Sequence, residues 1–358
     1  MSIDLRQLKE IIQSSNINVL IGAGASRPFM PVLGNIENAI KLADGNDTII
    51  LEQLRQYFSG VMMPTLNIID NGENLSATRT GKATPSDKER FDLTYEGYRG
   101  LLESVSRILL KRKTTLLNKQ INIFTTNIDV FMEKILEDSN FEYNDGFSGN
   151  VRPYFQTSNF YKSIYQTSAH FSNISEIPVF NLFKLHGSLS WELDYDKEKI
   201  VYSKLNLIKQ ISSCLDNNVD FKAKYDELQI VNPTKNKFRE TVMGVTHYEM
   251  LRMFSNELEK ENSVLFVIGF SMTDEHIREI TKRAANSNPT LKIYLFCYSD
   301  GKTKTDFETW FQDMRYQNIE IVVPEENTNY DINTINSRFF ATILDKKREV
   351  EDSNGSQD

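Results

Sequence analysis

The sequence predicts an α/β protein built on a doubly wound, mostly parallel sheet. Two observations carry this prediction. Short apolar runs of strand length alternate along the chain with stretches of helical periodicity, which is the pattern of repeated strand-helix-strand units. Several of these runs are continuously apolar and rich in β-branched residues, as expected for parallel strands that helices cover on both faces.

The amino-terminal segment has the order helix, strand, turn, helix. Residues 5–12 have the spacing of an amphipathic helix, and residues 17–21 form an apolar run that predicts a buried strand. A glycine turn follows directly and leads into a helical pattern near residues 36–42. This order is the opening unit of many nucleotide-binding sheets.

Residues 45–117 predict a helical insertion between the first and second strands. Helical patterns at 49–63 and 95–117 flank residues 71–90, which are polar and rich in Ser, Thr, Gly and Lys. That composition indicates a mobile surface loop. A loop in this position is a candidate cover for a neighbouring binding site.

The rest of the chain supplies the remaining strands. A second insertion is expected at residues 190–256, and the charged tail at 346–358 is expected to be frayed. Residues 1–345 are thus predicted to form a single domain. The strands expected after the first are residues 121–124, 179–184, 264–268, 293–296 and, at an edge, 319–323.

Composition argues against several classes of function. The 358 residues include 41 basic and 49 acidic side chains, and the net charge of −8 argues against a broad nucleic-acid-binding surface. The two cysteines, Cys214 and Cys297, allow neither a disulfide framework nor a four-cysteine zinc module. The sequence contains no recognisable signal peptide and no apolar run of about 18 residues, so we expect a cytoplasmic protein that does not span a membrane.

Three short motifs directly follow predicted strands and should therefore open at one edge of the sheet. A glycine turn can hold a pyrophosphate through backbone N–H groups, and an amide and an imidazole beside it would lie where a ribose binds. The set points to chemistry on a dinucleotide. In chain order, the motifs are Gly22-Ala23-Gly24-Ala25-Ser26, Thr125-Thr126-Asn127-Ile128-Asp129 and Leu185-His186-Gly187-Ser188.

Each motif also has a purely structural interpretation. The glycines can simply allow a tight bend, and the dinucleotide-binding fingerprint is incomplete because Arg27 stands where it requires Gly or Ala. Asp129 can be a helix cap, and His186 can hydrogen-bond to backbone. Three such motifs at neighbouring strand ends are unexpected by chance, so we interpret the set as functional.

These motifs resemble the signature of the sirtuin superfamily, which also has a Gly-x-Ser turn after a later strand. In this chain the turn is Gly269-Phe270-Ser271. The resemblance covers roughly residues 15–300. It implies a Rossmann-like, sirtuin-like fold that uses NAD as a substrate.

The resemblance also assigns roles to individual residues. Asn127 would hold the ribose hydroxyls and orient the attacking water, Asp129 would bind the carboxamide of nicotinamide, and His186 would act as a base. In sirtuin deacylases a glutamine precedes the motif asparagine, whereas this chain has Thr126. The residues implied to bind the rest of the dinucleotide are Gly22, Ala23, Gly24, Ser26, Gly269 and Ser271.

Two departures indicate which branch of the superfamily the chain resembles. The four-cysteine zinc ribbon of the deacylases is missing, as is their proline-aspartate-phenylalanine-arginine stretch, which residues 28–35 do not contain. The chain looks instead like the bacterial sirtuin-like proteins of antiphage defence, which hydrolyse NAD. Segments 230–235 and 267–277 are similar to members encoded beside a HerA-type hexameric ATPase, which implies that ATPase as a partner and a homo-oligomeric assembly.

Three functions from different classes remain open at this point. The first is an NAD glycohydrolase that releases nicotinamide and ADP-ribose and acts in defence by depleting NAD. The second is an NAD-dependent protein ADP-ribosyltransferase or deacylase. The third is a module that senses NAD or ADP-ribose without turnover.

Several other polar residues are interpreted as structural. Thr273 or Asp274 is expected to cap a helix whose first turn contains His276. His170 and His247 have no motif around them and are expected to be ordinary surface or hydrogen-bonded residues.

Overall fold

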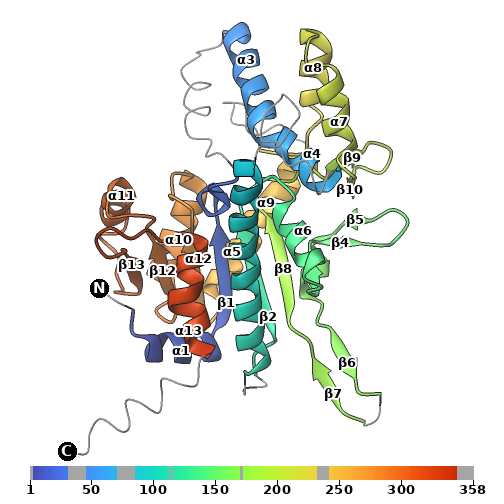
Figure 1. The fold of residues 1–358 in the computed structure, drawn as a ribbon. Coiled ribbons are helices and arrows are strands. Elements are labelled where there is room, and N and C mark those ends of the chain that lie inside the picture. The colour runs from blue at the N-terminus through green and yellow to red at the C-terminus, as the bar shows by residue number, and fades with distance from the viewer. Residues whose placement is uncertain are drawn as a thin grey trace, which may run out of the picture.

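The fold is organised around one sheet of seven parallel strands (Figure 1). The structure is a computed structural model and describes residues 3–30, 46–70, 85–112, 114, 116–169, 172–231 and 242–344. The strands lie in the order β13-β12-β11-β1-β2-β8-β3. Their bounds are β1 (Asn16–Ile21), β2 (Gln120–Thr125), β3 (Tyr143–Asn144), β8 (Val179–Lys184), β11 (Ser263–Ile268), β12 (Lys292–Phe296) and β13 (Ile319–Val322).

The strand order confirms the predicted fold class. If the short edge strand β3 is left out and the other strands are numbered along the chain, they lie in the order 3-2-1-4-5-6, which is the Rossmann order. All six residues of β8 and of β11 are buried, and most of them are apolar, although β8 also buries Asn181 and Lys184. The strands predicted at residues 17–21, 121–124, 179–184, 264–268, 293–296 and 319–323 are all present.

Helices cover both faces of the sheet. On one face Ile17, Val19 and Ile21 of β1 belong to a core with α1 (Leu5–Ser14), α5 (Pro85–Leu110), α6 (Phe131–Asp138), α12 (Ile332–Ile335) and the short segments η4 (Asn336–Phe340) and α13 (Ala341–Leu344). On the other face Leu20 belongs to a core with α9 (Val242–Glu259), α10 (Glu275–Ser287) and α11 (Lys302–Trp310). Successive residues of one strand thus serve opposite layers, as in a doubly wound sheet.

The two segments predicted as insertions divide between the sheet and a separate helical module. Although α5 and α9 fall within those segments, both pack on the sheet. The remaining helices share a third apolar core, in which Phe58 and Phe221 meet edge to face at 6.1 Å. This module lies at the top of Figure 1 and consists of α3 (Asp47–Tyr57), the π-helical segment η2 (Phe58–Met62), α4 (Met63–Asp70), α7 (Asn206–Ser213) and α8 (Asn218–Tyr225).

Three expectations concern residues that the structure does not describe. The predicted helix at 36–42, residues 71–84 of the predicted loop and the tail at 346–358 all lie outside the described residues. The loop prediction is wrong at its end, because α5 already begins at Pro85. Proline suits the first turn of a helix, where its missing N–H has no intrahelical partner.

A small antiparallel sheet was not foreseen from the sequence. It has the strand order β4-β5-β10-β9, formed by β4 (Phe147–Ser148), β5 (Tyr154–Phe155), β10 (Lys199–Tyr202) and β9 (Trp191–Asp194). A separate hairpin of β6 (Tyr165–Thr167) and β7 (Ile174–Glu176) projects at the bottom right of Figure 1. Within the described ranges, no helix is long and apolar enough to cross a membrane.

Candidate functional site

The candidate site lies at the carboxyl edge of the sheet, where β1 and β11 are neighbours. The strand order reverses at this pair, which is the position where ligands bind in open α/β sheets. The turn after β1 continues into η1 (Ala23–Ser26), a single 3₁₀ turn, and the turn after β11 begins at Gly269. The predicted glycine motif therefore stands at the expected topological position.

The turns after β1 and β11 are packed directly against each other. The N–H of Gly24 donates to the carbonyl oxygen of Gly269 at 2.9 Å. A Cβ atom at Gly22 or Gly24 would come within 2.7 Å of that same oxygen. Gly269 has φ +63°, and a Cβ there would lie 2.1 Å from the backbone nitrogen of Ala25. All three glycines are thus required by the contact between the two turns, whatever the site binds.

Asn127 is held at the glycine turn from the neighbouring strand end. Its Nδ2 lies 3.2 Å from Oγ of Ser26 and 3.5 Å from the carbonyl oxygen of Gly22. The Ser26 hydroxyl is buried and also contacts the buried Tyr98 hydroxyl at 2.9 Å. The Ser26 hydroxyl therefore anchors Asn127 at the glycine turn, and its expected contact with a phosphate stays a prediction.

His186 follows β8, next to the motif that follows β2. The two segments are tied by hydrogen bonds from Leu185 N–H to Thr125 O at 2.8 Å and from Leu189 N–H to Ile128 O at 2.9 Å. The imidazole of His186 contacts a carboxylate: its Nε2 lies 3.1 Å from Oδ2 of Asp274, which precedes α10. Two side-chain pairs therefore lie at this edge: Asn127 with Ser26, and His186 with Asp274.

The contacts of Asp274 include one that the sequence interpretation found and one that it missed. Its Oδ1 accepts a hydrogen bond from Ile277 N–H at 3.2 Å and caps α10, as predicted. Its Oδ2 binds His186, a residue 88 positions away in the sequence. Because a carboxylate can only accept, Nε2 of His186 carries the proton in this contact, and Nδ1 of a neutral ring is the acceptor. Sequence reasoning missed this role, although Asp274 follows the Gly-Phe-Ser turn at the same sheet edge.

His247 lies behind His186, with a ring-centroid separation of 6.2 Å. It is buried, and its Nδ1 donates to the carbonyl oxygen of Leu185 at 2.6 Å. Burial lowers the pKa of His247, while the hydrogen bond to Leu185 acts in the opposite direction. The sequence interpretation of His247 as a hydrogen-bonded polar residue therefore agrees with the structure.

Asp129 belongs to a buried polar cluster under the motif that follows β2. Its Oδ1 accepts from Phe131 N–H at 2.9 Å at the start of α6, which matches the structural alternative considered for it. Its carbonyl oxygen accepts from Nζ of Lys184, which also pairs with Glu133 at 3.2 Å. Burial raises the pKa of Glu133 to about 7, and the Lys184 ammonium partly offsets this effect. These contacts fix the backbone on which Asn127 stands.

The remaining predicted contacts and segments are placed as follows. Ser271 is exposed, and its Oγ lies 3.1 Å from Oγ1 of Thr273. Val231 N–H donates to the carbonyl oxygen of His186 at 2.8 Å. Residues 232–235 of the segment 230–235 and His170 lie outside the described residues. In the part of the chain that the structure describes, no cluster of three or more His, Cys, Asp or Glu side chains is arranged to hold a metal ion.

The fold and this edge define a nucleotide-binding α/β protein of the Rossmann type. Comparison with family models is more specific: the model described as "SIR2-like domain" matches residues 121–319, which is more than half of the 358 residues. The chain therefore belongs to the SIR2-like family. That match includes the motifs around Asn127, His186 and Gly269, and it implies an NAD-related, sirtuin-like function.

Other comparisons add little beyond the family. A solved structure described as "The Structural basis for Sirtuin Substrate affinity" has 14% sequence identity and a TM-score of 0.43, with 99% of this chain and 100% of that chain covered. No curated protein matches the chain at a significant level.

Proposed function

We propose that this protein is an NAD glycohydrolase, which converts NAD⁺ and water into nicotinamide, ADP-ribose and a proton. The observation that carries the proposal is the joint placement of an anchored amide and a carboxylate-bound imidazole at the switch-point edge of a SIR2-like domain. Both groups indicate chemistry on a bound nucleotide as well as its binding. An imidazole with a carboxylate partner is a common arrangement for moving a proton.

The chemistry needs little acid catalysis but does need a positioned water. Nicotinamide leaves NAD⁺ as a neutral base, so the bond to C1′ of the ribose breaks without prior protonation of the leaving group. Enzymes promote such steps by holding the sugar and by accepting a proton from the nucleophile. We assign the first task to Asn127, whose amide is fixed by Ser26 at the glycine turn.

We assign the second task, accepting a proton from the nucleophile, to His186. With Nε2–H bound to Asp274, Nδ1 is the nitrogen that can take a proton from water or from a ribose hydroxyl. The imidazolium that forms is then stabilised by the same carboxylate. General-base catalysis of this kind contributes roughly 10²–10⁴ in rate. Asp274 is therefore a positioning residue, because it acts on the reaction through His186.

The test of this proposal is product analysis on the purified full-length chain incubated with NAD. Release of nicotinamide together with an equal amount of free ADP-ribose supports the hydrolase. A mass increase on a protein acceptor, or loss of an acyl group from a lysine peptide, identifies the transferase or deacylase instead. NAD binding measured by calorimetry without nicotinamide release identifies a sensor and overturns the enzyme assignment.

The biological setting is proposed with the same activity. We propose that the protein acts in the cytoplasm as a homo-oligomer, together with a HerA-type hexameric ATPase, in an antiphage system that depletes NAD. The similarity of segment 267–277 to defence-type sequences supports this setting. The test is mass photometry of the chain with and without a HerA-type ATPase, paired with the NAD assay. Absence of a joint complex contradicts the partner assignment and leaves the chemistry to be judged separately.

A further inference from the structure

A row of asparagines crosses the sheet at the third residue of three six-residue strands, away from the carboxyl edge that holds the candidate active site. Asn18, Asn122 and Asn181 occupy matching register positions on β1, β2 and β8. Asn122 Nδ2 donates to Asn18 Oδ1 at 2.9 Å, and Asn181 Nδ2 donates to Asn122 Oδ1 at 3.0 Å. The neighbouring strand positions are almost all apolar and buried, so three amides at this depth are an exception that packing does not explain.

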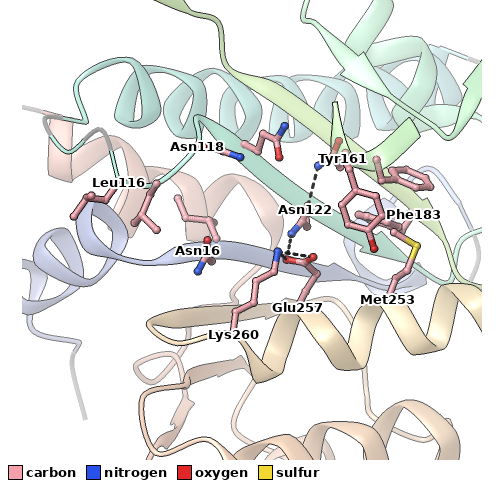
Figure 2. A pocket seen from close by; sticks show the side chains of 14 residues that line it. Asn16, Leu116, Asn118, Asn122, Tyr161, Phe183, Met253, Glu257 and Lys260 are labelled. Carbon is pink, nitrogen blue, oxygen red and sulfur yellow. Dashed lines mark hydrogen bonds and ion pairs between the residues drawn. The ribbon is translucent and has the colours of Figure 1, made fainter. Parts of the chain in front are cut away.

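A cavity of about 300 Å³ lies against this row, between the amino ends of the strands and helix α9 (Figure 2). Asn122 and Asn181 line it from the sheet, and Glu257 and Lys260 line it from α9. None of the cavity's lining residues belongs to the carboxyl-edge motifs. The cavity is therefore separate from the site proposed for NAD.

The hydrogen bonds of the asparagine row leave one acceptor, Asn181 Oδ1, and one donor, Asn18 Nδ2, unmatched within the described ranges, and of these two residues only Asn181 lines the cavity. Glu257 Oε2 accepts from Asn122 Nδ2 at 3.0 Å, and its carboxylate pairs with Lys260 Nζ at 2.6 Å. Asn181 is only 2% exposed, and its Oδ1 has no hydrogen-bond partner within the described ranges. Leaving a buried acceptor unmatched is unfavourable. A ligand that suits this cavity therefore brings N–H or O–H donors.

Aromatic side chains make up the other side of the cavity. In Figure 2 Tyr161 and Phe183 lie close together at one end, near Met253. Phe160 stacks on Phe183 with ring centroids 4.0 Å apart, whereas Tyr161 is 66% exposed. An exposed tyrosine at the mouth of a polar cavity offers a stacking surface for a flat heterocycle.

We propose that this cavity binds an amino-substituted nucleobase as the free base or nucleoside, with its exocyclic amine donating to Asn181 Oδ1 and its ring against Tyr161. The volume stands at the low end of the roughly 300–1,000 Å³ range of small-molecule sites, which favours a single base over a dinucleotide. The proposal is independent of the NAD hydrolase proposal, because the two sites share no residue.

The experiment is calorimetry on the full chain with adenosine and with purine riboside, which differs from adenosine only by the missing amine. We expect adenosine to bind and purine riboside to bind at least about tenfold more weakly, because the acceptor then stays unmatched. Saturating NAD should leave adenosine binding unchanged, since NAD is assigned to the other edge. Equal affinities for the two nucleosides, displacement by NAD or no binding at millimolar adenosine would each overturn the proposal.

Two tyrosine variants test whether adenosine binds in this cavity. Tyr161→Ala should weaken adenosine binding by at least about fivefold, because stacking on an aromatic ring is lost. The matched control is Tyr165→Ala in the neighbouring hairpin, since Tyr165 is 59% exposed and does not line the cavity. Both tyrosines are exposed, so neither change should impair folding. Equal affinities in the two variants would place adenosine elsewhere and contradict the assignment.

Discussion

The contact between Asp274 and His186 gives the sharpest single-residue prediction. Asp274→Asn keeps the size of the side chain and the cap on α10, because asparagine caps helices about as well as aspartate. It removes the negative charge 3.1 Å from Nε2 of His186. The new amide can also donate its N–H to Nε2, which moves the ring proton to Nδ1 and blocks the nitrogen assigned as the base.

The size of the effect follows from the exposure of the pair. Hydrogen bonds to charged groups contribute about 1.5–3 kcal/mol, and the side chains of His186 and Asp274 retain 21% and 18% of their exposure. Because both side chains are partly solvated, we take the low end of this energy range. A loss of about 1.5 kcal/mol of transition-state stabilisation corresponds to at least about a tenfold fall in kcat. KM should stay unchanged, because Asp274 is not assigned any contact with NAD.

The assay is steady-state NAD hydrolysis, combined with nitrogen-15 NMR of the histidine rings to read the tautomer of His186. Asp331→Asn is the matched control, since Asp331 also caps a helix, through a 2.7 Å bond from Thr334 N–H, but is remote from His186 in the fold. We expect the control to retain wild-type kcat and the wild-type tautomer. An Asp274→Asn protein with wild-type kcat and an unchanged His186 tautomer would refute the reasoning.

Two further predictions concern stability. Gly269→Ala should destabilise the fold by about 3 kcal/mol or more, because the new Cβ would lie 2.1 Å from Ala25 N at a φ of +63°. The control Gly60→Ala, with no neighbouring atom found within 4 Å of its Cβ, should be neutral or slightly stabilising. Chemical denaturation of both variants measures their unfolding free energies, and similar values would contradict the packing argument. Because the pKa of Glu133 is raised from 4.5 to about 7, the folded state binds more protons than the unfolded state between these values, so this group lowers the unfolding free energy as pH rises through that window. Glu133→Gln should remove this contribution, about 1–3 kcal/mol, and flatten the pH dependence between 4.5 and 7; an unchanged slope would mean that Lys184 holds Glu133 ionised.

The sheet was predictable because its signal is local. Strands such as β8 and β11 are buried on both faces, so each appears in the sequence as a mostly apolar run with turn residues at its end. The motifs were assigned to one edge for the same reason, since parallel strands present their carboxyl ends together. The contact of Asn127 with the glycine turn bears out that placement.

Features that depend on distant contacts were not predictable. The strands β4 and β5 have two residues each, too few for any periodicity to be read. The packing of Phe58 on Phe221 joins two segments that the sequence suggested were separate insertions. The cap at Asp274 was visible in the sequence, but its second bond to His186 depends on how β8 and β11 are spaced in the sheet.

The most direct test of the central claim is nicotinamide release from NAD by four proteins: the wild type, Asn127→Ala, His186→Ala and the control His276→Ala. His276 is an exposed residue of the same type in the first turn of α10 and is not assigned to the machinery. The account predicts release by the wild type and the control, and a loss of at least about 100-fold in the other two, with circular dichroism unchanged. Wild-type rates in both Asn127→Ala and His186→Ala would contradict it.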